Sequence, residues 1–141
     1  LGLERQFVLN LGGGSTFNSG SSSLSEEGKQ AVDGFLNDLG ATEGLIFLVA
    51  GHTDTTGSEE KNYDLGQKRA TSVARYLTKQ GIDPFRVSTV SYGEEKPVTD
   101  NQTAEGKRQN RRIEISVYRE AFTSAPPQVS SPRVETQDSA Y

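Results

Sequence analysis

Charged residues at three places in the sequence are suited to binding one small ligand. Asp54 lies in the segment Gly51-His52-Thr53-Asp54-Thr55-Thr56-Gly57, directly after a continuous apolar run. Arg69 follows in a helical pattern, and Arg111 and Arg112 precede the last apolar segment. A carboxylate and guanidinium groups that face one cleft suit a zwitterion, which presents an ammonium group and a carboxylate together. The first hypothesis is therefore a zwitterion site, which the fold must assemble from these residues.

Arg69 interrupts an apolar pattern. It lies four residues after Leu65 and four before Val73, on or beside the helix face that should be apolar. A guanidinium there needs a partner, since an unpaired buried charge is costly. A salt bridge to Asp54 or Asp64, or a side chain that covers apolar surface, would be a purely structural explanation. Alternatively, Asp54 and Arg69 pair in the empty site and share the ligand in the full one. We favour a binding role.

The other candidates also have structural alternatives. Asp54 follows the apolar strand at its carboxyl end, where open α/β sheets bind ligands, but Asp before Gly is also common in turns. Asn62, near the start of the second helix, is expected to cap that helix, although its amide could reach a ligand. Strand alternation sends Arg111 and Arg112 to opposite faces, so that one faces the cleft and the other solvent.

The predicted elements alternate between strands and helices. Apolar spacing and turn residues predict strands at 6–11, 45–50, 87–92 and 112–118, and helices at 23–39 and from about 58 or 62 to 80. A capping box at 23–26 is expected to start the first helix, and 94–109 is expected to be a polar loop. The continuous apolar run at 45–50 predicts a strand buried on both faces. Ile113, Ile115 and Val117 alternate with polar residues, which predicts one covered face.

The order β-α-β-α-β-β predicts an α/β (α+β) sandwich. We expect a mixed parallel and antiparallel sheet with the helices packed on it. Ser, Pro and Thr become frequent from Ala121 onward. The predicted organisation is therefore one domain at residues 1–120 and a flexible tail at 121–141. Because the sequence starts at Leu1 and contains no Met, we expect a processed or excised piece of a longer protein.

Composition argues against several classes of function. The net charge of −4 over 141 residues gives no basic surface for nucleic acid. No apolar run approaches the roughly 20 residues that a transmembrane helix needs. The chain has no Cys and a single His, His52, so thiol chemistry, a metal site and a cofactor are not expected.

Four spaced blocks of the sequence carry a family resemblance. They are Gly51-His52-Thr53-Asp54-x-x-Gly57, Asn62-x-x-Leu65-Gly66-x-x-Arg69-Ala70-x-x-Val73, Val90-Ser91-Tyr92-Gly93-x-x-x-Pro97 and Asn110-Arg111-Arg112-Ile113-Glu114-Ile115. Together they resemble the OmpA-like peptidoglycan-binding domain, a family that includes the carboxy-terminal domain of OmpA, the lipoprotein Pal and the stator protein MotB. The resemblance covers roughly residues 5–119.

The resemblance implies a β-α-β-α-β-β fold and non-covalent binding of peptidoglycan stem peptides through diaminopimelate. Asp54 would hold the ammonium group and Arg69 the carboxylate, while Asn62, Arg111 and Thr55 would line the same pocket. The first loop departs from the family. Members often carry a Phe-Asp-x-(Asn/Ser) segment there, whereas this chain has Phe17-Asn18-Ser19-Gly20 and lacks the aligned acid.

The leading hypothesis is a periplasmic cell-wall-binding module that is not an enzyme. It would anchor an outer-membrane or other envelope protein to peptidoglycan, through a segment outside this chain that reaches the outer membrane, or the inner membrane in a stator-type protein. One alternative is a module whose cleft binds an envelope protein partner. A less favoured one is a cell-wall hydrolase using Asp54 and His52, for which the sequence offers no second acid at a defined spacing and no metal-ligand set.

Overall fold

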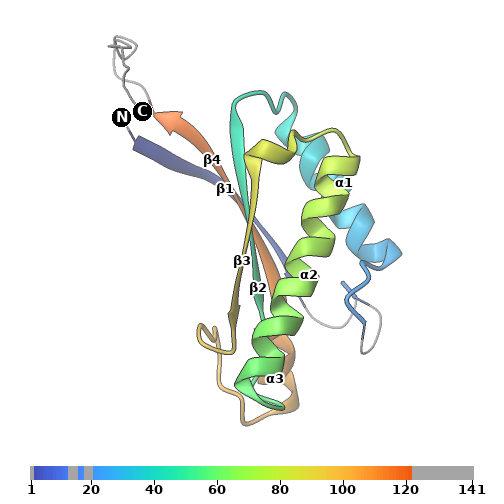
Figure 1. Cartoon of the computed structure of the whole chain (residues 1–141), viewed down its shortest axis with the longest axis vertical. Coiled ribbons are helices and arrows are strands. Elements are labelled where there is room, and N and C mark those ends of the chain that lie inside the picture. Colours follow the sequence, from blue (N-terminus) through green and yellow to red (C-terminus); the bar gives the residue numbers. More distant parts are fainter. Residues whose placement is uncertain (1, 13–15, 18–20, 122–141) are drawn as a thin grey trace, which may run out of the picture.

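The computed structural model describes residues 2–12, 16–17 and 21–121 of the chain. Its elements, shown in Figure 1, are β1 (Gly2–Gly12), α1 (Glu26–Leu39), β2 (Leu45–His52), α2 (Glu59–Lys79), the 3-10 helix η1 (Pro84–Arg86), β3 (Val87–Gly93), α3 (Ala104–Asn110) and β4 (Arg112–Ala121). The predicted β-α-β-α-β-β order is confirmed, with two short helices added. No helix in the described ranges is long and apolar enough to cross a membrane.

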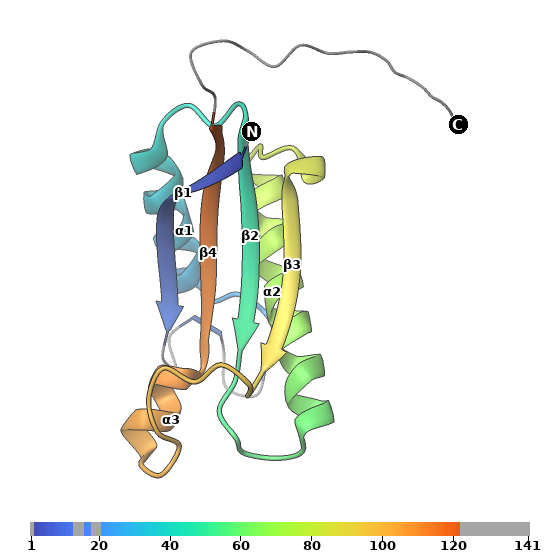
Figure 2. The ribbon, with the colours of Figure 1, turned by 90° about the vertical axis from the view of Figure 1, so that its left-hand side faces the viewer.

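The four strands form one mixed sheet in the order β1-β4-β2-β3, which Figure 2 shows face on. β4 is antiparallel to both of its neighbours, whereas β2 and β3 are parallel. A parallel pair needs a crossover connection, and α2 supplies it. The carboxyl ends of β2 and β3 and the start of β4 therefore share one end of the sheet, which we call the cluster end.

At the opposite end of the sheet, which we call the entry end, lie the first residue of β1 and the last residue of β4. Gly2 of β1 pairs with Ala121 of β4 there. The described chain thus enters and leaves the sheet at one end, away from α3 (Figure 2).

Helices α1 and α2 lie on the same face of the sheet (Figures 1 and 2). The strand side chains that point toward them form the centre of the core, at 1% exposure or less: Leu45, Phe47, Val49, Ile113, Ile115 and Val117. The alternation predicted for β4 is therefore confirmed. On α2, the residues that face the sheet follow the predicted stripe and are fully buried: Ala70, Val73 and Leu77.

The prediction that β2 is buried on both faces was wrong for its first half. Ile46 and Leu48 point to the face without helices and are only half-buried. Ala50 and His52 on that face are buried, and Tyr92 stacks on the imidazole with ring centroids 5.2 Å apart. The uncovered face of the sheet thus closes toward the cluster end.

Helix α1 starts later than the predicted capping box. Its N-cap is Ser25, whose hydroxyl accepts a hydrogen bond from the Gly28 amide at 3.0 Å. Leu24 is held outside the helix by a bridge to Phe17, and the Ser25 amide donates to the Thr16 carbonyl at 2.8 Å. Ser23 therefore belongs to the preceding segment.

Helix α3 occupies part of the predicted polar loop, so that prediction was wrong. Thr103 caps this helix by accepting from the Gly106 amide at 2.9 Å. Gly106 is buried, and a side chain there would collide with the carbonyl of Asp100. The helix is short and polar, so it lacks the apolar period that identifies longer helices.

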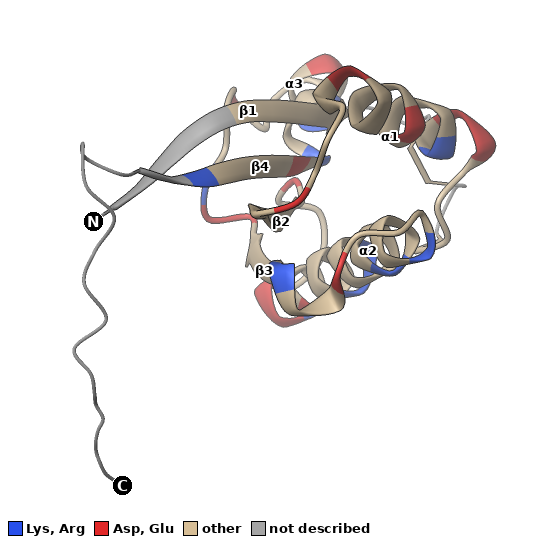
Figure 3. Cartoon of the chain, turned by 90° about the horizontal axis from the view of Figure 1, so that it is seen from above, with Lys and Arg blue, Asp and Glu red and all other residues tan. Residues whose placement is uncertain are grey.

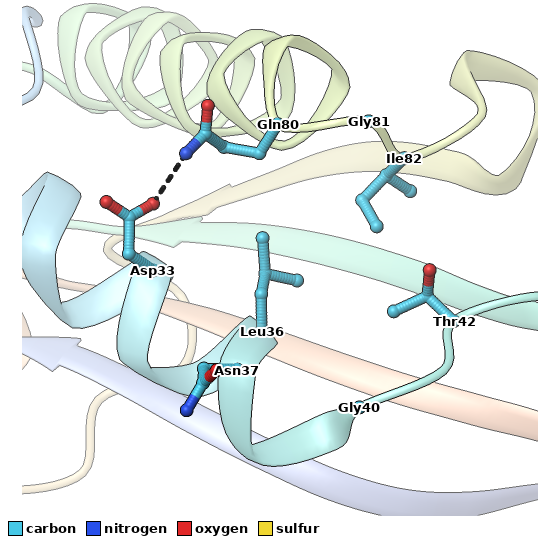
Figure 4. Close-up of a pocket in the computed structure, with 8 residues that line it drawn as sticks. All are labelled: Asp33, Leu36, Asn37, Gly40, Thr42, Gln80, Gly81 and Ile82. Carbon is cyan, nitrogen blue, oxygen red and sulfur yellow. Dashed lines mark hydrogen bonds between the residues drawn. The ribbon is translucent and has the colours of Figure 1, made fainter.

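A cavity of about 430 Å³ lies at the entry end, between the last turns of α1 and α2 (Figure 4). The carboxylate of Asp33 joins the two helices, because it accepts hydrogen bonds from the Tyr76 hydroxyl at 2.7 and 2.9 Å and from the Gln80 amide at 2.9 Å. Leu36 and Ile82 supply apolar lining. All the donors to Asp33 are neutral, so this cavity carries no matched pair of opposite charges.

Candidate functional site

The cluster end positions Asp54 immediately beyond β2. The Thr53 amide donates to the Gly93 carbonyl at 2.8 Å, which ties the end of β2 to the end of β3. Asp54 is only 5% exposed. One carboxylate oxygen accepts from the Thr56 amide at 2.8 Å, and the other accepts from Nη1 of Arg111 at 2.6 Å. Asp54 therefore has the turn role that was considered as a structural alternative, and it also forms an ion pair with Arg111.

These contacts determine the charge state of Asp54. Burial alone would raise the pKa of its carboxyl group, but hydrogen bonds from Thr56 and the Arg111 guanidinium outweigh that effect. The pKa of Asp54 therefore lies below its ordinary value. The group is an anion at neutral pH, as an ammonium-binding residue must be.

Arg69 contacts the first loop and neither of the aspartates that were considered as structural partners. Its Nε and Nη2 both donate to the Ser21 carbonyl, at 3.2 and 3.1 Å, and its guanidinium lies 4.9 Å from the centroid of the Phe17 ring. Within the described residues it forms no ion pair, so the alternative in which Asp54 and Arg69 pair in the empty site is wrong, and Arg111 pairs with Asp54 instead. A guanidinium has five N–H donors, so Arg69 keeps donors that these contacts do not use.

Arg69 nevertheless lies close to the Asp54–Arg111 ion pair, and we call these three side chains the charge cluster. Burial, and then the like charge of Arg111, lower the pKa of Arg69, while the negative charge of Asp54 opposes them. The three groups are therefore close enough to interact. Asp54 is paired with Arg111, so Arg69 is the guanidinium of these three groups that has no ion-pair partner among the described residues.

Close backbone packing holds α2 against the sheet next to Arg69. An added side chain at Gly51 of β2 would collide with the Gly66 carbonyl of α2. At Gly66 an added Cβ would lie 2.5 Å from the Ser91 hydroxyl. That hydroxyl donates to the Tyr63 carbonyl at 2.8 Å, so it is fixed in place. Gly66 precedes Arg69 by three residues, so this packing sets the height of Arg69 above the sheet.

Asn62 does not cap α2, contrary to the prediction. The cap is Ser58, which accepts from the Lys61 amide at 3.1 Å. Asn62 is buried, and its amide group donates to the Asp54 carbonyl at 3.2 Å and to Glu94 Oε1 at 2.9 Å. It therefore braces the backbone of Asp54 from α2. Thr55 is exposed beside Asp54, and its side chain makes no hydrogen bond to the described part of the chain.

The two consecutive arginines do not divide between cleft and solvent as predicted. Arg111 faces the cluster and pairs with Asp54, and its side chain is 38% exposed. Arg112 is buried and pairs with Glu114 at 2.7 Å. The prediction failed because the loop after β3 covers this part of the sheet face that has no helices. Arg112 contacts that loop, since its guanidinium donates to the Lys96 carbonyl at 3.0 Å.

His52 occupies a core position at the end of β2. It is 3% exposed, and neither ring nitrogen has a hydrogen-bond partner. Burial, followed by the positive charge of Arg112, lowers its pKa to about 4. Over the described ranges, no three His, Cys, Asp or Glu residues are grouped as a metal site would require. His52 is therefore part of the buried interior at the end of β2.

Three contributors to the cluster were not predicted. Glu94 follows β3 as Asp54 follows β2, so the rule that ligand groups gather at the carboxyl ends of parallel strands could have identified it. Phe17 and the Ser21 carbonyl reach Arg69 from the first loop. A backbone carbonyl leaves no trace in a sequence, so that contact could not be found. The departure noted at Asn18, Ser19 and Gly20 lies outside the described residues.

A model of the OmpA family matches residues 16–111, a range that includes Asp54, Asn62, Arg69 and Arg111. The chain belongs to the OmpA family.

Proteins similar to this OmpA-family chain include lipoproteins and a MotB periplasmic domain. The probable lipoprotein YiaD of Escherichia coli K12 is 40% identical over 110 residues, 78% of this chain and 50% of that protein. The peptidoglycan-associated lipoprotein of Pseudomonas aeruginosa is 40% identical over 99 residues, 70% of this chain and 58% of that protein. The crystal structure of the periplasmic domain of Helicobacter pylori MotB matches with a TM-score of 0.70 and 26% identity, over 81% of this chain and 74% of that one. The chain spans about half the length of the curated relatives it matches.

Proposed function

We propose that this OmpA-family domain binds peptidoglycan non-covalently through the diaminopimelate of its stem peptide. The observation that carries the proposal is the charge cluster, in which Asp54 is paired with Arg111 while Arg69 has no carboxylate partner among the described residues. The free centre of diaminopimelate presents an ammonium group and a carboxylate on one carbon. It supplies both charges that this cluster is arranged to receive.

In the proposed complex, the ligand carboxylate lies against Arg69 and the ligand ammonium group against Asp54. Arg69 is held by the Ser21 carbonyl and the Phe17 ring, so little side-chain freedom is lost when it binds. Asp54 is held by Thr56 and Arg111. Arg111 then shares Asp54 with the ammonium group and can turn toward the ligand carboxylate, while Asn62 and Thr55 line the pocket.

The proposed role is attachment of an envelope protein to the cell wall, without enzymatic activity. The peptidoglycan-associated lipoprotein of Pseudomonas aeruginosa is named for such an association. We infer a periplasmic location, with residues 1–120 as the binding domain and 121–141 as a tail. A segment outside this chain would attach the domain to the outer membrane, or to the inner membrane in a stator-type protein.

Co-sedimentation with purified sacculi tests the proposal. Wild-type protein should sediment with sacculi that contain diaminopimelate, and free diaminopimelate should release it. Asp54→Ala and Arg69→Ala should each weaken binding by about 2–5 kcal/mol, because each leaves an opposite charge unpaired in the site. Asp33→Ala removes a carboxylate at the entry end and serves as the matched control, for which binding should be unchanged.

Sacculi that carry lysine in place of diaminopimelate provide the sharper comparison. Lysine keeps the amino group but lacks the second carboxylate, so Arg69 would have nothing to bind. We expect at least about a tenfold loss of affinity, the scale of one lost charged hydrogen bond. Equal binding to both kinds of sacculi, or unchanged binding by Arg69→Ala, would contradict the proposal.

A further inference from the structure

β4 begins with an ion pair that does not face the proposed ligand. Nε of Arg112 lies 2.7 Å from Oε2 of Glu114. The other two nitrogens of the same guanidinium donate to backbone carbonyls, Nη2 to Lys96 at 3.0 Å and Nη1 to Asn110 at 3.3 Å. Arg112 therefore fastens the loop after β3 to the residue that ends α3.

A second polar side chain fastens the same loop from the other direction. Asn110 is completely buried. Its side-chain oxygen Oδ1 accepts hydrogen bonds from the backbone amides of Val98 and Thr99, at 2.8 and 3.1 Å. Its side-chain nitrogen Nδ2 donates to the Thr99 carbonyl at 3.0 Å and to the Asn101 side chain at 2.9 Å. The hydrogen-bonding capacity of the side chain is used up within the loop.

Arg111 stands between these two fixed residues. Within the part of the chain that the structure describes, its side chain forms one hydrogen bond, to Asp54, and more than a third of the side chain is exposed. Its amide also closes the last turn of α3, on the Lys107 carbonyl at 3.1 Å. A long, exposed arginine with one contact loses conformational entropy when it is held in a single geometry. Its reach to Asp54 therefore depends on how firmly its backbone is held.

We infer that Arg112 and Glu114, together with Asn110, are positioning residues that hold the Arg111 guanidinium against Asp54. The inference rests on the proposed function for its consequence in binding, but its structural part concerns the Asp54–Arg111 pair alone. Glu114 orients Arg112, Arg112 and Asn110 fix the backbone on both sides of Arg111, and Arg111 reaches the site.

The chemistry of the pair supports this role. A buried ion pair usually adds little net stability, because desolvation offsets the attraction. The fork of arginine, however, binds three acceptors in one plane with defined directions, which lysine cannot do. His52 lies 3.7 Å from Glu114 with both ring nitrogens unpaired. Because the imidazole is neutral, it does not compete with the Arg112 guanidinium for the Glu114 carboxylate.

The first test is Arg112→Lys, which keeps the charge and loses the fork. The pKa of the Asp54 carboxyl group, followed by carbon NMR, should rise from its lowered value toward the ordinary one as Arg111 detaches. Affinity for sacculi containing diaminopimelate should fall on the order of tenfold. Added to Arg111→Ala, the same change should cause no further loss, because a residue that acts through Arg111 has nothing left to act on.

Glu114→Gln is the second variant, since it keeps the shape of the side chain and removes its charge. It should reproduce the Asp54 titration shift in a folded protein even if Arg112→Lys unfolds. The matched control is Glu105→Gln, which removes the exposed Arg108–Glu105 pair of nearby α3 and should change neither readout.

The possible results separate the two proposals. If the Asp54 titration is unaltered in both variants, or if their losses of affinity add fully to that of Arg111→Ala, the positioning role is wrong. If wild-type protein fails to bind sacculi while the titration shift appears, the proposed function fails and the positioning of Arg111 stands.

Discussion

Each end of the sheet places an aspartate between elements of the fold, but the two carboxylates have different kinds of partner. At the entry end, Asp33 is exposed and accepts three hydrogen bonds from the neutral groups of Tyr76 and Gln80. At the cluster end, Asp54 is buried against the Arg111 guanidinium, and the Arg69 guanidinium nearby forms no ion pair within the described residues. Figure 3 shows how charged residues are spread over the helices and the ends of the strands.

The cavity of about 430 Å³ lies beside Asp33, whose carboxylate accepts from neutral donors. At the cluster end, the Asp54 carboxylate lies 2.6 Å from a guanidinium nitrogen, and Arg69 forms no ion pair within the described residues. A half-buried cation without an ion-pair partner is costly until a ligand supplies the opposite charge, so it is the stronger indication of a binding site.

The largest effect is expected where backbones touch at the cluster end. Gly51→Ala would drive a methyl group into the Gly66 carbonyl of α2. We expect it to lower the free energy of unfolding by about 3 kcal/mol or more, since neither backbone can move without disturbing the core. Denaturant unfolding measures the loss. A variant as stable as wild type would show that α2 is not held by this close approach.

Acidic pH should weaken the cluster end through His52. Its folded pKa of about 4 lies below the ordinary 6.5, so the unfolded state binds more protons between these values. Unfolding free energy should therefore fall as the pH drops from 6.5 toward 4, by up to about 3 kcal/mol, and level off below that range for this group.

His52→Phe isolates that contribution, because it keeps a ring against Tyr92 and removes the titrating group. The difference in pH dependence between the two proteins, from denaturant unfolding, is the measurement. As His52 is the single histidine, its imidazole resonance also gives the pKa directly. A midpoint near 6.5 would show that the ring is solvated.

A smaller effect is expected at the entry end from Tyr76→Phe. It removes the hydroxyl that bridges α2 to Asp33 of α1, at a cost of about 1 kcal/mol in unfolding free energy. Binding to sacculi should stay at the wild-type level, because these groups belong to the opposite end of the sheet. A parallel loss of binding would remove the distinction drawn between the two ends.

The smallest change should come from Gly34→Ala on α1. No atom lies within 4 Å of an added side chain there, so alanine should stabilise the helix by about 0.5–1 kcal/mol. Thermal unfolding measures the gain, and sacculus binding should not change. Together with Gly51→Ala it compares the same substitution in open space and in close contact.

Most of the fold was predictable from local patterns. The period of the apolar residues locates both long helices and the strands, and the position of Asp54 beyond a buried strand locates the cluster end. The later start of α1 was not predictable, because two serines with similar capping ability lie close together. Only the contact of Leu24 with Phe17 decides in favour of Ser25.

The partners within the site were harder to predict than the site itself. Arg69 stood out because it interrupts an apolar face, but its partner is a carbonyl from the first loop. The burial of Arg112 depends on a loop that folds back over the sheet, which strand alternation does not reveal. Asn62 resembles a cap in the sequence and serves as a brace, because Ser58 captures the helix terminus first.

The path of β4 has a mechanical consequence. Arg111 immediately precedes β4, and the far end of this ten-residue strand pairs with Gly2, where the described chain enters the sheet. A pull between the proposed ligand at the cluster end and the entry end would therefore be directed along a strand of roughly 33 Å that has neighbours on both sides. Its backbone hydrogen bonds are loaded in shear and share the force, whereas a peeled strand would break them one after another. The domain is thus arranged as a stiff link that resists tension along its own length.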